Sequence, residues 1–275
     1  MRRRRLQRRR VSRFGVLYRA EHRAALFAHS AQVDVLEIVA EHFLDLTAEQ
    51  RDELDVLRAH FDVTVHALAT SIGSSDGVDG RYLARIAALV DYVRPLWWSD
   101  HLAMTHACGV ELGAFAPLSR TEETVAIVAR NVAAVRDAVP GRFALENPAT
   151  AFLVPSDTLD AAAYLARIAA AADCELILDL ENLHADAWNV GTDAGAVVAA
   201  IPAERVCEVH LAGGRRTRDG YVDAHDGPVP ERTWALCRAF CRRCVPPLTL
   251  LEREAALPPL SNLLDELDAA RAAAA

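Results

Sequence analysis

A regular alternation of short apolar runs with longer amphipathic segments constrains this chain more than any other feature. Eight runs are rich in β-branched or apolar residues, and we expect each to form a strand: 14–19, 33–40, 63–69, 96–103, 142–149, 174–183, 206–214 and 247–254. Segments of helical period lie between them, for example 47–61, 80–93, 121–139 and 157–172. Such alternation is typical of βαβ units, whose parallel strands are buried on both faces. It predicts an α/β protein, a single-domain (β/α)8 TIM barrel.

The length of the chain agrees with one barrel. Barrels of this type need roughly 250 residues, and the chain has 275. We expect residues 14–275 to form the barrel and residues 1–13, which hold eight arginines and no acid, to form a disordered tail. A doubly wound open sheet is the alternative topology. Its nucleotide-binding version should carry a glycine-rich turn after the first strand, and GVLYRAEH has none.

Two helical segments open with the spacing of a capping box. Thr47 is followed by Gln50 and Ser119 by Glu122, so that each pair can satisfy backbone N–H groups of the first helical turn. We therefore expect helices to begin at these two positions.

The charge pattern excludes several classes of function. Without the eight arginines of the tail, the formal net charge of −8 becomes about −16 for the rest of the chain, which argues against nucleic acid as the main partner. No apolar run approaches the roughly 18 residues of a membrane span, and no apolar signal core follows the arginines, so we expect a cytoplasmic protein without a membrane partner. Lysine is absent, which excludes lysine Schiff bases, pyridoxal phosphate attachment and P-loops.

The six cysteines include a C-x3-C-x2-C run at Cys237, Cys241 and Cys244. Radical-SAM enzymes use this spacing for an iron–sulfur cluster, in a loop after an early strand. Here the run lies in a helical stretch near the C-terminus, where it places three small side chains on one helix face. We interpret these cysteines as packing residues, reduced like the others.

Polar residues gather at the expected carboxyl ends of the strands, which is where barrel active sites lie. They are Glu41, His42, His66, Asp100, His101, Glu146, Asn147, Asp179, Glu181, Asn182, His184, Glu208, His210, Asp223, His225 and Glu252. So many charges in one confined mouth need a counter-charge, which a divalent cation supplies. Imidazoles with carboxylates suit iron, zinc or manganese, and the inventory exceeds what one ion can use. It predicts a site for two metal ions.

The other histidines help to test this interpretation. His22, His29 and His60 fall on expected helices or their ends, and His106 falls in an expected loop, so we interpret all four as structural or exposed. Glu37 lies inside the second expected strand, and the period alone does not settle whether it points inward.

The strand-end segments resemble a known family. SSDG after VTVHALATSIG, then SDHLAM, LENPA, LDLEN, EVHLAGG and D-x-H-x-G-P, in this order over roughly residues 14–255, resemble the multinuclear non-haem iron-dependent oxidative enzymes, which are xylose-isomerase-like TIM barrels. Characterised members hold two or three irons and oxidatively modify peptides, commonly at cysteine, in the maturation of ribosomally synthesised natural products. A partner protein usually delivers the peptide.

The resemblance implies a ligand set and catalytic residues. The implied ligands are His66, His101, Glu146, Asp179, His210, Asp223, His225 and Glu252, with Glu146, Asp179 and His210 as catalytic residues. Two departures stand out: Asn189-Val190-Gly191 replaces the usual Asn-His-Gly, and Glu41-His42 replaces the usual Glu-Asn. Further ligands could come from Glu41, His42, Asn182 or His184, and the sequence leaves open whether His42 or His184 compensates for Val190.

Three functions therefore remain open at this point. The resemblance implies an oxidoreductase that uses two or three irons, in mixed Fe(II) and Fe(III) states, and O2 to modify a peptide at cysteine, with a peptide-recognition partner. The alternative enzyme is a divalent-metal sugar-phosphate isomerase or epimerase, which needs acid–base groups but no O2. The third is a non-catalytic scaffold that lost its activity together with the ligand expected at Val190.

Overall fold

The structure is a computed structural model that describes residues 12–275. The arginine-rich tail expected over residues 1–13 therefore falls outside the described residues, apart from its last two positions. Ser12 Oγ donates a hydrogen bond to the Pro246 carbonyl, and Arg13 already belongs to the first strand. The barrel thus begins one residue earlier than the sequence predicts.

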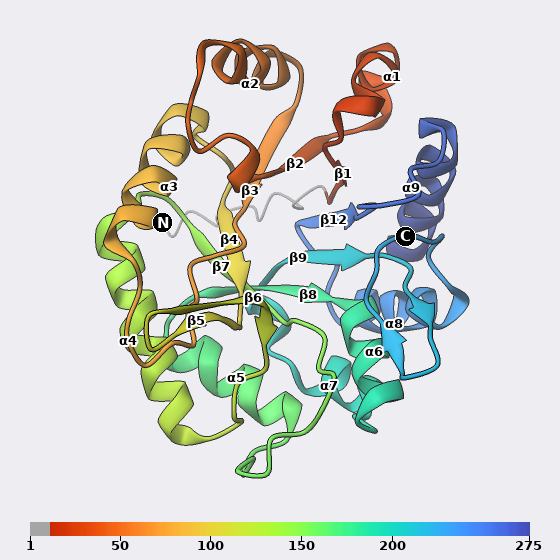
Figure 1. Cartoon of the computed structure of the whole chain (residues 1–275). Helices are drawn as coiled ribbons and strands as arrows, with labels where there is room; N and C mark the ends of the chain where they lie inside the picture. The colour runs from red at the N-terminus through yellow and green to blue at the C-terminus, as the bar shows by residue number, and fades with distance from the viewer. Residues whose placement is uncertain (1–11) are drawn as a thin grey trace, which may run out of the picture.

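Eight parallel strands close into a barrel, which confirms the predicted fold (Figure 1). Each strand pairs with its neighbours in chain order, and the first pairs with the last, so the red and blue ends of the chain lie side by side. The barrel strands are β1 (Arg13–Leu17), β2 (Val35–Val39), β3 (Asp62–His66), β4 (Trp98–His101), β7 (Phe143–Glu146), β8 (Glu175–Asp179), β9 (Val206–Leu211) and β12 (Leu248–Leu251).

Helices surround the barrel on its outer side (Figure 1). The α-helices are α1 (Arg23–Ala28), α2 (Ala48–His60), α3 (Gly80–Val93), α4 (Glu122–Ala138), α5 (Ala161–Ala171), α6 (Leu180–Asn189), α7 (Ala194–Ala200), α8 (Glu231–Cys241) and α9 (Leu260–Ala274). Short 3-10 turns are η1 (Ala20–His22), η2 (Ser30–Gln32), η3 (Ala40–His42) and η4 (Ala203–Arg205). Within residues 12–275, no helix combines the length and apolar character needed to cross a bilayer.

One predicted strand includes residues that are helical. The expected strand over 174–183 ends at Asp179, and α6 starts at the next residue. The change is abrupt because Asp179 is also the N-cap of the helix: its Oδ1 accepts a hydrogen bond from the Asn182 N–H at 2.6 Å. Residues 180–183 are therefore helical.

Two hairpins lie outside the predicted pattern. Strands β5 (Met104–Ala107) and β6 (Val110–Ala116) pair antiparallel after β4, and β10 (Arg215–Arg216) pairs with β11 (Tyr221–Val222) after β9. The first hairpin turns through Cys108 and Gly109, whose φ angles of 51° and 73° are both positive, as a two-residue type I′ turn requires. His106 therefore lies on a strand, and its assignment to a loop was wrong.

The capping-box predictions have different outcomes. At α2, Thr47 and Gln50 bond to each other's backbone N–H, which confirms the box. At α4 the prediction was wrong, because the N-cap is Thr121, which accepts from the Thr124 N–H, while Ser119 Oγ bonds to Ser156 Oγ. Several hydroxyls precede this helix, and spacing alone does not choose among them.

The interior of the barrel is divided into an apolar and a polar half. Its amino-terminal half is filled by a cluster of buried apolar residues: Val35, Trp97, Ala144, Ile177, Cys207, Leu248 and Leu250. Because side chains alternate with a period of two, Glu37, Glu146, Asp179 and Glu252 follow on the same inward face, two residues further along their strands. A second, larger core packs the helices against the outside of the barrel.

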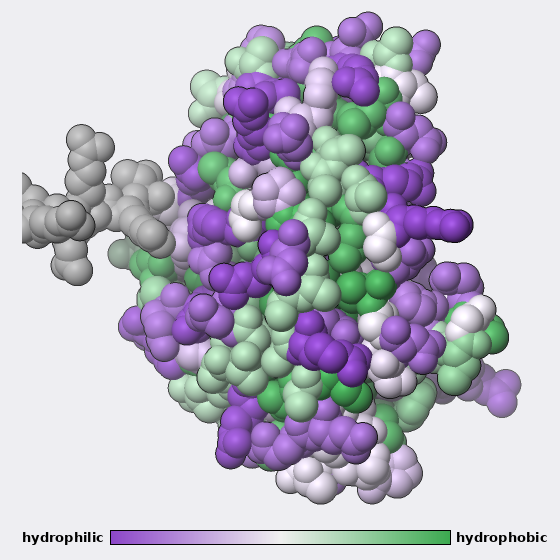
Figure 2. Space-filling model, turned by 90° about the vertical axis from the view of Figure 1, so that its left-hand side faces the viewer, coloured by the Kyte–Doolittle hydropathy of each residue, from purple (hydrophilic) through white to green (hydrophobic). Residues whose placement is uncertain are grey.

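The outer surface beside α3 and α4 is mixed in character. Figure 2 shows polar residues over most of this face, with apolar residues between them. The apolar residues form a band down the middle of this view, so this side of the molecule is not uniformly polar.

Gly15 tests the packing of the interior. A Cβ at this position would lie 2.5 Å from the Val35 carbonyl oxygen and 3.0 Å from Leu250 Cδ1. We expect Gly15→Ala to lower the free energy of unfolding by about 1–3 kcal/mol, because the backbone must shift. Gly80→Ala is the control: nothing lies within 4 Å of its Cβ, and a helical alanine should be neutral or stabilising. Urea denaturation measures both, and equal effects would contradict the packing argument.

Candidate metal centre

The barrel brings the predicted ligands to one end. His66, His101, Glu146 and Asp179 are the last residues of β3, β4, β7 and β8, and Glu252 directly follows β12. The register sets neighbouring pairs at the same height, with His101 beside Glu146 and Asp179 beside His210. Because parallel strands share one carboxyl end, these side chains meet in the mouth.

One ligand set contains two imidazoles and one carboxylate. The ligand atoms of His66, His101 and Glu146 all lie within 4.8 Å of one another. Glu146 Oε2 is 3.4 Å from His66 Nε2 and 3.8 Å from His101 Nε2. All three side chains are buried or nearly so, at 4%, 12% and 2% exposure.

A second set shares Glu146 with the first. Glu146, Asp179, His210 and Glu252 also place ligand atoms within 4.8 Å of one another. Here His210 Nδ1 lies 3.4 Å from Glu146 Oε1 and 3.2 Å from Glu252 Oε2. The two oxygens of Glu146 therefore face different sets, which is the arrangement of a carboxylate that bridges two ions.

Asp223 and His225 lie at the edge of the second set. His225 Nδ1 is 3.2 Å from Glu252 Oε2, and its Nε2 is 2.5 Å from Asp223 Oδ1 and 3.8 Å from Asp179 Oδ2. All eight predicted ligands are thus brought together, in a chain of contacts that runs from His66 to Asp223.

The spacing of these atoms fits metal coordination. Two ligand atoms that are each about 2.1 Å from one ion are separated by about 3.0–3.5 Å, for angles between 90° and the tetrahedral value. The distances of 3.2–3.8 Å in both sets come close to this range. Among the described residues, buried atoms without any hydrogen-bond partner include Glu146 Oε2, Asp179 Oδ2 and both ring nitrogens of His210 and of His225. Since buried polar atoms are normally bonded, this donor set fits an ion.

The protonation equilibria of the cluster are strongly shifted. Burial, together with the neighbouring His101, lowers the pKa of His66 to about 4. Burial alone would raise the pKa of Glu146, but His210 and His101 lower it to about 2. A neutral imidazole and an ionised carboxylate are the forms that bind metals.

Further residues orient the ligands. Ser99 Oγ lies 2.8 Å from His66 Nδ1 and also contacts the Val65 carbonyl at 3.5 Å, so the hydroxyl can accept from Nδ1–H and leave the Nε2 lone pair for an ion. Asn147 makes two hydrogen bonds with the backbone of Asp179. Its Nδ2 donates to the Asp179 carbonyl, and its Oδ1 accepts from the Asp179 N–H. Neither orienting role was predicted from the sequence.

Three of the possible additional ligands lie apart from the sets. Glu41 Oε1 accepts from the Leu68 N–H and from the Tyr82 hydroxyl. His42 is exposed and borders a cavity on the η1 side of the barrel. His184 packs edge-on against Tyr221, with ring centroids 4.9 Å apart.

Asn182 and Val190 complete the comparison with the predicted set. Asn182 Nδ2 donates to the Asn147 carbonyl, while its Oδ1 is buried without a partner. Val190 is the C-cap residue directly after α6 and borders a cavity with α5 and α7 residues. None of the three groups of potential ligands in the described residues includes it, nor His42 or His184.

Two buried glutamates form a group that was not predicted: Glu208 was expected among the strand-end residues, and the direction of Glu37 was left open. Glu37 and Glu208 are fully buried and lie with His210 in a third set of potential ligand atoms. Burial and the facing Glu208 carboxylate raise the pKa of Glu37 well above its usual range. In the structure both point into the barrel, because each lies two residues from another inward side chain, Val35 or His210.

The cysteines stay out of these sets. Cys237 lies on α8 and belongs to the outer core, with Cys241 and Cys244 packed against it. No group of potential ligands in residues 12–275 contains a cysteine. The packing interpretation therefore accounts for the C-x3-C-x2-C run.

The β5–β6 hairpin lies over the first set. Phe115 of β6 stacks on the His101 ring, with centroids 4.0 Å apart and an interplanar angle of 26°. Phe115 is itself 39% exposed. It therefore separates His101 from solvent on one side and presents an apolar face to whatever enters the mouth.

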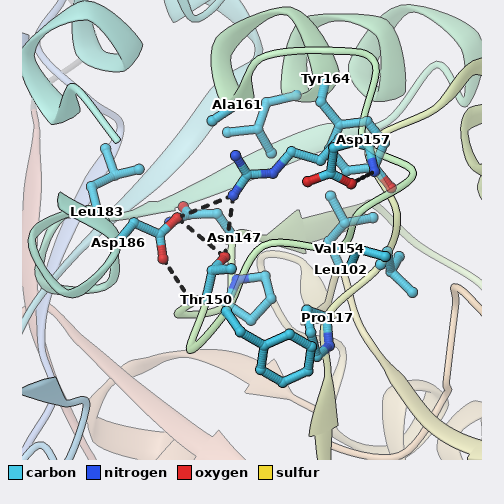
Figure 3. A pocket seen from close by; sticks show the side chains of 15 residues that line it. Leu102, Pro117, Asn147, Thr150, Val154, Asp157, Ala161, Tyr164, Leu183 and Asp186 are labelled. Atoms are coloured by element: carbon cyan, nitrogen blue, oxygen red, sulfur yellow. Dashed lines mark hydrogen bonds and ion pairs between the residues drawn. The ribbon is translucent and has the colours of Figure 1, made fainter. Parts of the chain in front are cut away.

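A small cavity, lined mainly by apolar side chains with a few polar groups, lies beside the site (Figure 3). Asn147, which binds the backbone of Asp179, forms part of its wall. Arg120 contacts Asp186 at 3.6 Å and Thr150 Oγ1 at 3.3 Å, and the Thr150 N–H donates to Asp186. Burial raises the pKa of Asp186 to about 6, although these partners favour its charged form.

A known family matches nearly the whole described chain. The sequence model described as RiPP precursor modification enzyme MbnB/TglH/ChrH matches residues 13–275. The chain is 39% identical over 241 residues to a UPF0276 protein of Rhizorhabdus wittichii, covering 87% of this chain and 86% of the relative. It is 37% identical over 260 residues to a UPF0276 protein of Caulobacter vibrioides, covering 94% and 93%.

Solved structures share the fold. The 3-keto-D-glucoside 4-epimerase of E. coli superposes with a TM-score of 0.59 at 16% identity, over 95% of this chain and all of that one. At this identity the likeness concerns the barrel alone.

Asp186 predicts a pH effect on stability. Its pKa is about 6 in the folded protein against a reference of 3.8, so between these values the folded state binds more protons than the unfolded state. Its contribution to the free energy of unfolding is therefore greatest below about pH 4 and falls, by up to about 3 kcal/mol, as the pH rises through 6.

Asp186→Asn should remove this pH-dependent contribution to the free energy of unfolding. We expect the difference in unfolding free energy, wild type minus variant, to decline between pH 4 and 6 and to level off above. Urea titrations across this range measure it, and parallel curves for the two proteins would contradict the prediction.

Proposed function

The chain belongs to the family of RiPP precursor modification enzymes that includes MbnB, TglH and ChrH, and from this we propose that it uses iron and O2 to oxidise a precursor peptide, at a cysteine. The proposed centre holds two irons, in the sets that meet at Glu146, and Asp223 with His225 offers ligands for a third. A separate recognition protein would deliver the peptide.

The position of Glu146 is the observation that carries the proposal. Its Oε2 faces His66 and His101, and its Oε1 faces His210. A single-ion site needs no such carboxylate between two groups of ligands. Both groups combine imidazole with carboxylate and lack thiolate, which suits iron.

The bound irons would supply one-electron chemistry with O2, and the protein would bind, orient and shield. Ser99 fixes the His66 ring, and the N-terminus of α6 together with Asn147 fixes Asp179. Glu146, Asp179 and His210 are the residues we assign to the reacting region, because the second set surrounds them. Phe115 limits access of water to His101.

Apolar residues near the mouth support a peptide substrate. Exposed large apolar side chains in the described residues include Leu112 and Phe115 of β6, Phe152 and Leu153 of the segment after β7, and Trp188 of α6. These elements all follow the carboxyl ends of barrel strands. An extended peptide could pack on them while one side chain reaches the ligands.

The sugar-phosphate alternative receives less support from the arginines that would hold a phosphate. Arg215 pairs with Asp226, and the Arg216 guanidinium lies 3.8 Å from the centroid of the Trp188 ring. Both are thus already engaged. Such an enzyme would also turn over without O2.

Iron content and O2 uptake test the proposal. Purified without air and loaded with ferrous iron, the protein should bind more than one equivalent and consume O2 when a cysteine-containing precursor peptide is added. Glu146→Gln should bind less iron and lower O2 uptake by about 100-fold or more, because an amide cannot bridge two cations.

Glu181→Gln is the matched control. Glu181 is equally buried, but its oxygens accept hydrogen bonds from the Gly214 N–H, Tyr221 and Thr233 outside the ligand sets. It should keep its iron. A wild-type protein that cannot be loaded with iron, or that acts on a sugar phosphate without O2, would contradict the proposal.

A further inference from the structure

A second layer of carboxylates lies beneath the metal ligands. Glu37 on β2 and Glu208 on β9 are both completely buried, between the apolar half of the barrel and the mouth. Each carboxylate has one oxygen, Oε1, without a hydrogen-bond partner. Two buried carboxylates with free oxygens are costly unless a donor faces them.

His210 lies between this layer and the second ligand set. Its Nδ1 faces Glu146 and Glu252, at 3.4 and 3.2 Å. Its Nε2 faces the other way, 3.5 Å from Glu37 Oε1 and 3.5 Å from Glu208 Oε1. The imidazole ring of His210 therefore directs Nδ1 toward the second ligand set and Nε2 toward the two glutamates beneath it.

The far oxygens of the two glutamates are held in place. The Trp97 indole N–H donates to Glu208 Oε2 at 2.8 Å, and the Thr64 hydroxyl donates to Glu37 Oε2 at 3.2 Å. These bonds aim both free oxygens at the same ring nitrogen. An N–H···O bond of ordinary length then needs one carboxylate to approach by about half an ångström.

This geometry favours an orienting role over a third ion. An imidazole that binds a cation through Nδ1 keeps its proton on Nε2, and that N–H needs an acceptor. An ion between Glu37 and Glu208 would instead require His210 to lose this proton as well. The acceptor role gives the Nε2–H a carboxylate oxygen on either side, and the ring stays neutral.

We propose that Glu37 and Glu208 are positioning residues, which accept the Nε2–H bond of His210 and so hold its Nδ1 toward the second metal ion. The inference rests on the metal binding by His210 in the proposed function, and it requires neither iron nor O2 chemistry.

Cobalt(II) affinity is the first test. Glu208→Gln and Glu37→Gln should each weaken binding of one Co(II) by about 10–100-fold, with the number of ions at saturation unchanged. The Co(II) absorption bands should shift, because the ring orientation changes. Glu181→Gln, the same substitution at a buried glutamate outside the cluster, should alter neither. Loss of a whole equivalent of Co(II) would make the glutamates ligands and overturn the proposal, as would effects equal to those of Glu181→Gln.

Nitrogen-15 NMR of the histidine rings gives a second test that does not depend on affinity. In the zinc(II)-loaded protein, His210 should carry its proton on Nε2, with the proton resonance of a strong hydrogen bond. Glu208→Gln or Glu37→Gln should move that resonance, whereas Glu181→Gln should not. A proton on Nδ1, or a resonance that neither variant moves, would overturn the proposal.

The two proposals can fail separately. Co(II) and Zn(II) binding need no peptide and no O2. A protein that binds both ions as expected but never oxidises a peptide would refute the proposed function and leave the orienting role intact. If the wild-type protein oxidises a peptide with iron and O2, but Glu208→Gln and Glu37→Gln bind Co(II) as tightly as the wild type, the proposed function stands and the orienting role is refuted.

Discussion

The closed parallel barrel forces charged side chains from distant parts of the chain into one buried mouth. Glu146, Asp179 and Glu252 arrive on three different strands, and each is almost fully excluded from water. Carboxylates in this position repel one another and lose hydration, so the fold tolerates them only with positive partners. Histidines supply part of that compensation, and a divalent cation would supply the rest. Much of the local architecture can be understood as a response to this concentration of charge.

The orientation of the candidate ligands depends on a row of residues that lie directly behind them. The side chains of four residues outside the two main ligand sets contact members of those sets or their backbone: Ser99, Asn147, Glu37 and Glu208. A site built on strand ends gains precision from such contacts, because strand backbones are fixed by the barrel and only side-chain torsions remain free. The apolar cluster below prevents this row from reaching water at the other end of the barrel.

The alternating pattern allowed prediction of the barrel and of a polar cluster at its mouth, because strand ends in a closed parallel sheet must converge. The choice of eight ligands within that cluster came from the family resemblance. The direction of Glu37 and the roles of Ser99 and Glu208 remained hidden, since they depend on which faces meet inside the barrel. His42 and His184 are near the ligands in sequence yet lie outside the sets, because η3 and α6 turn them away. Hairpins such as β5–β6 depend on a short turn at Cys108-Gly109, a signal weaker than strand periodicity.

The junction between β8 and α6 gives one residue two duties. Asp179 uses Oδ1 to cap the helix and leaves Oδ2 facing the second set. Because Oδ1 accepts the hydrogen bond of the helix, the carboxylate could bind an ion only as a monodentate ligand, through Oδ2. Rotation of the carboxylate is also coupled to the first turn of the helix. If an ion binds at Oδ2, unwinding of this helical turn and release of the ion become linked events, because binding to the ordered form stabilises the first turn of α6.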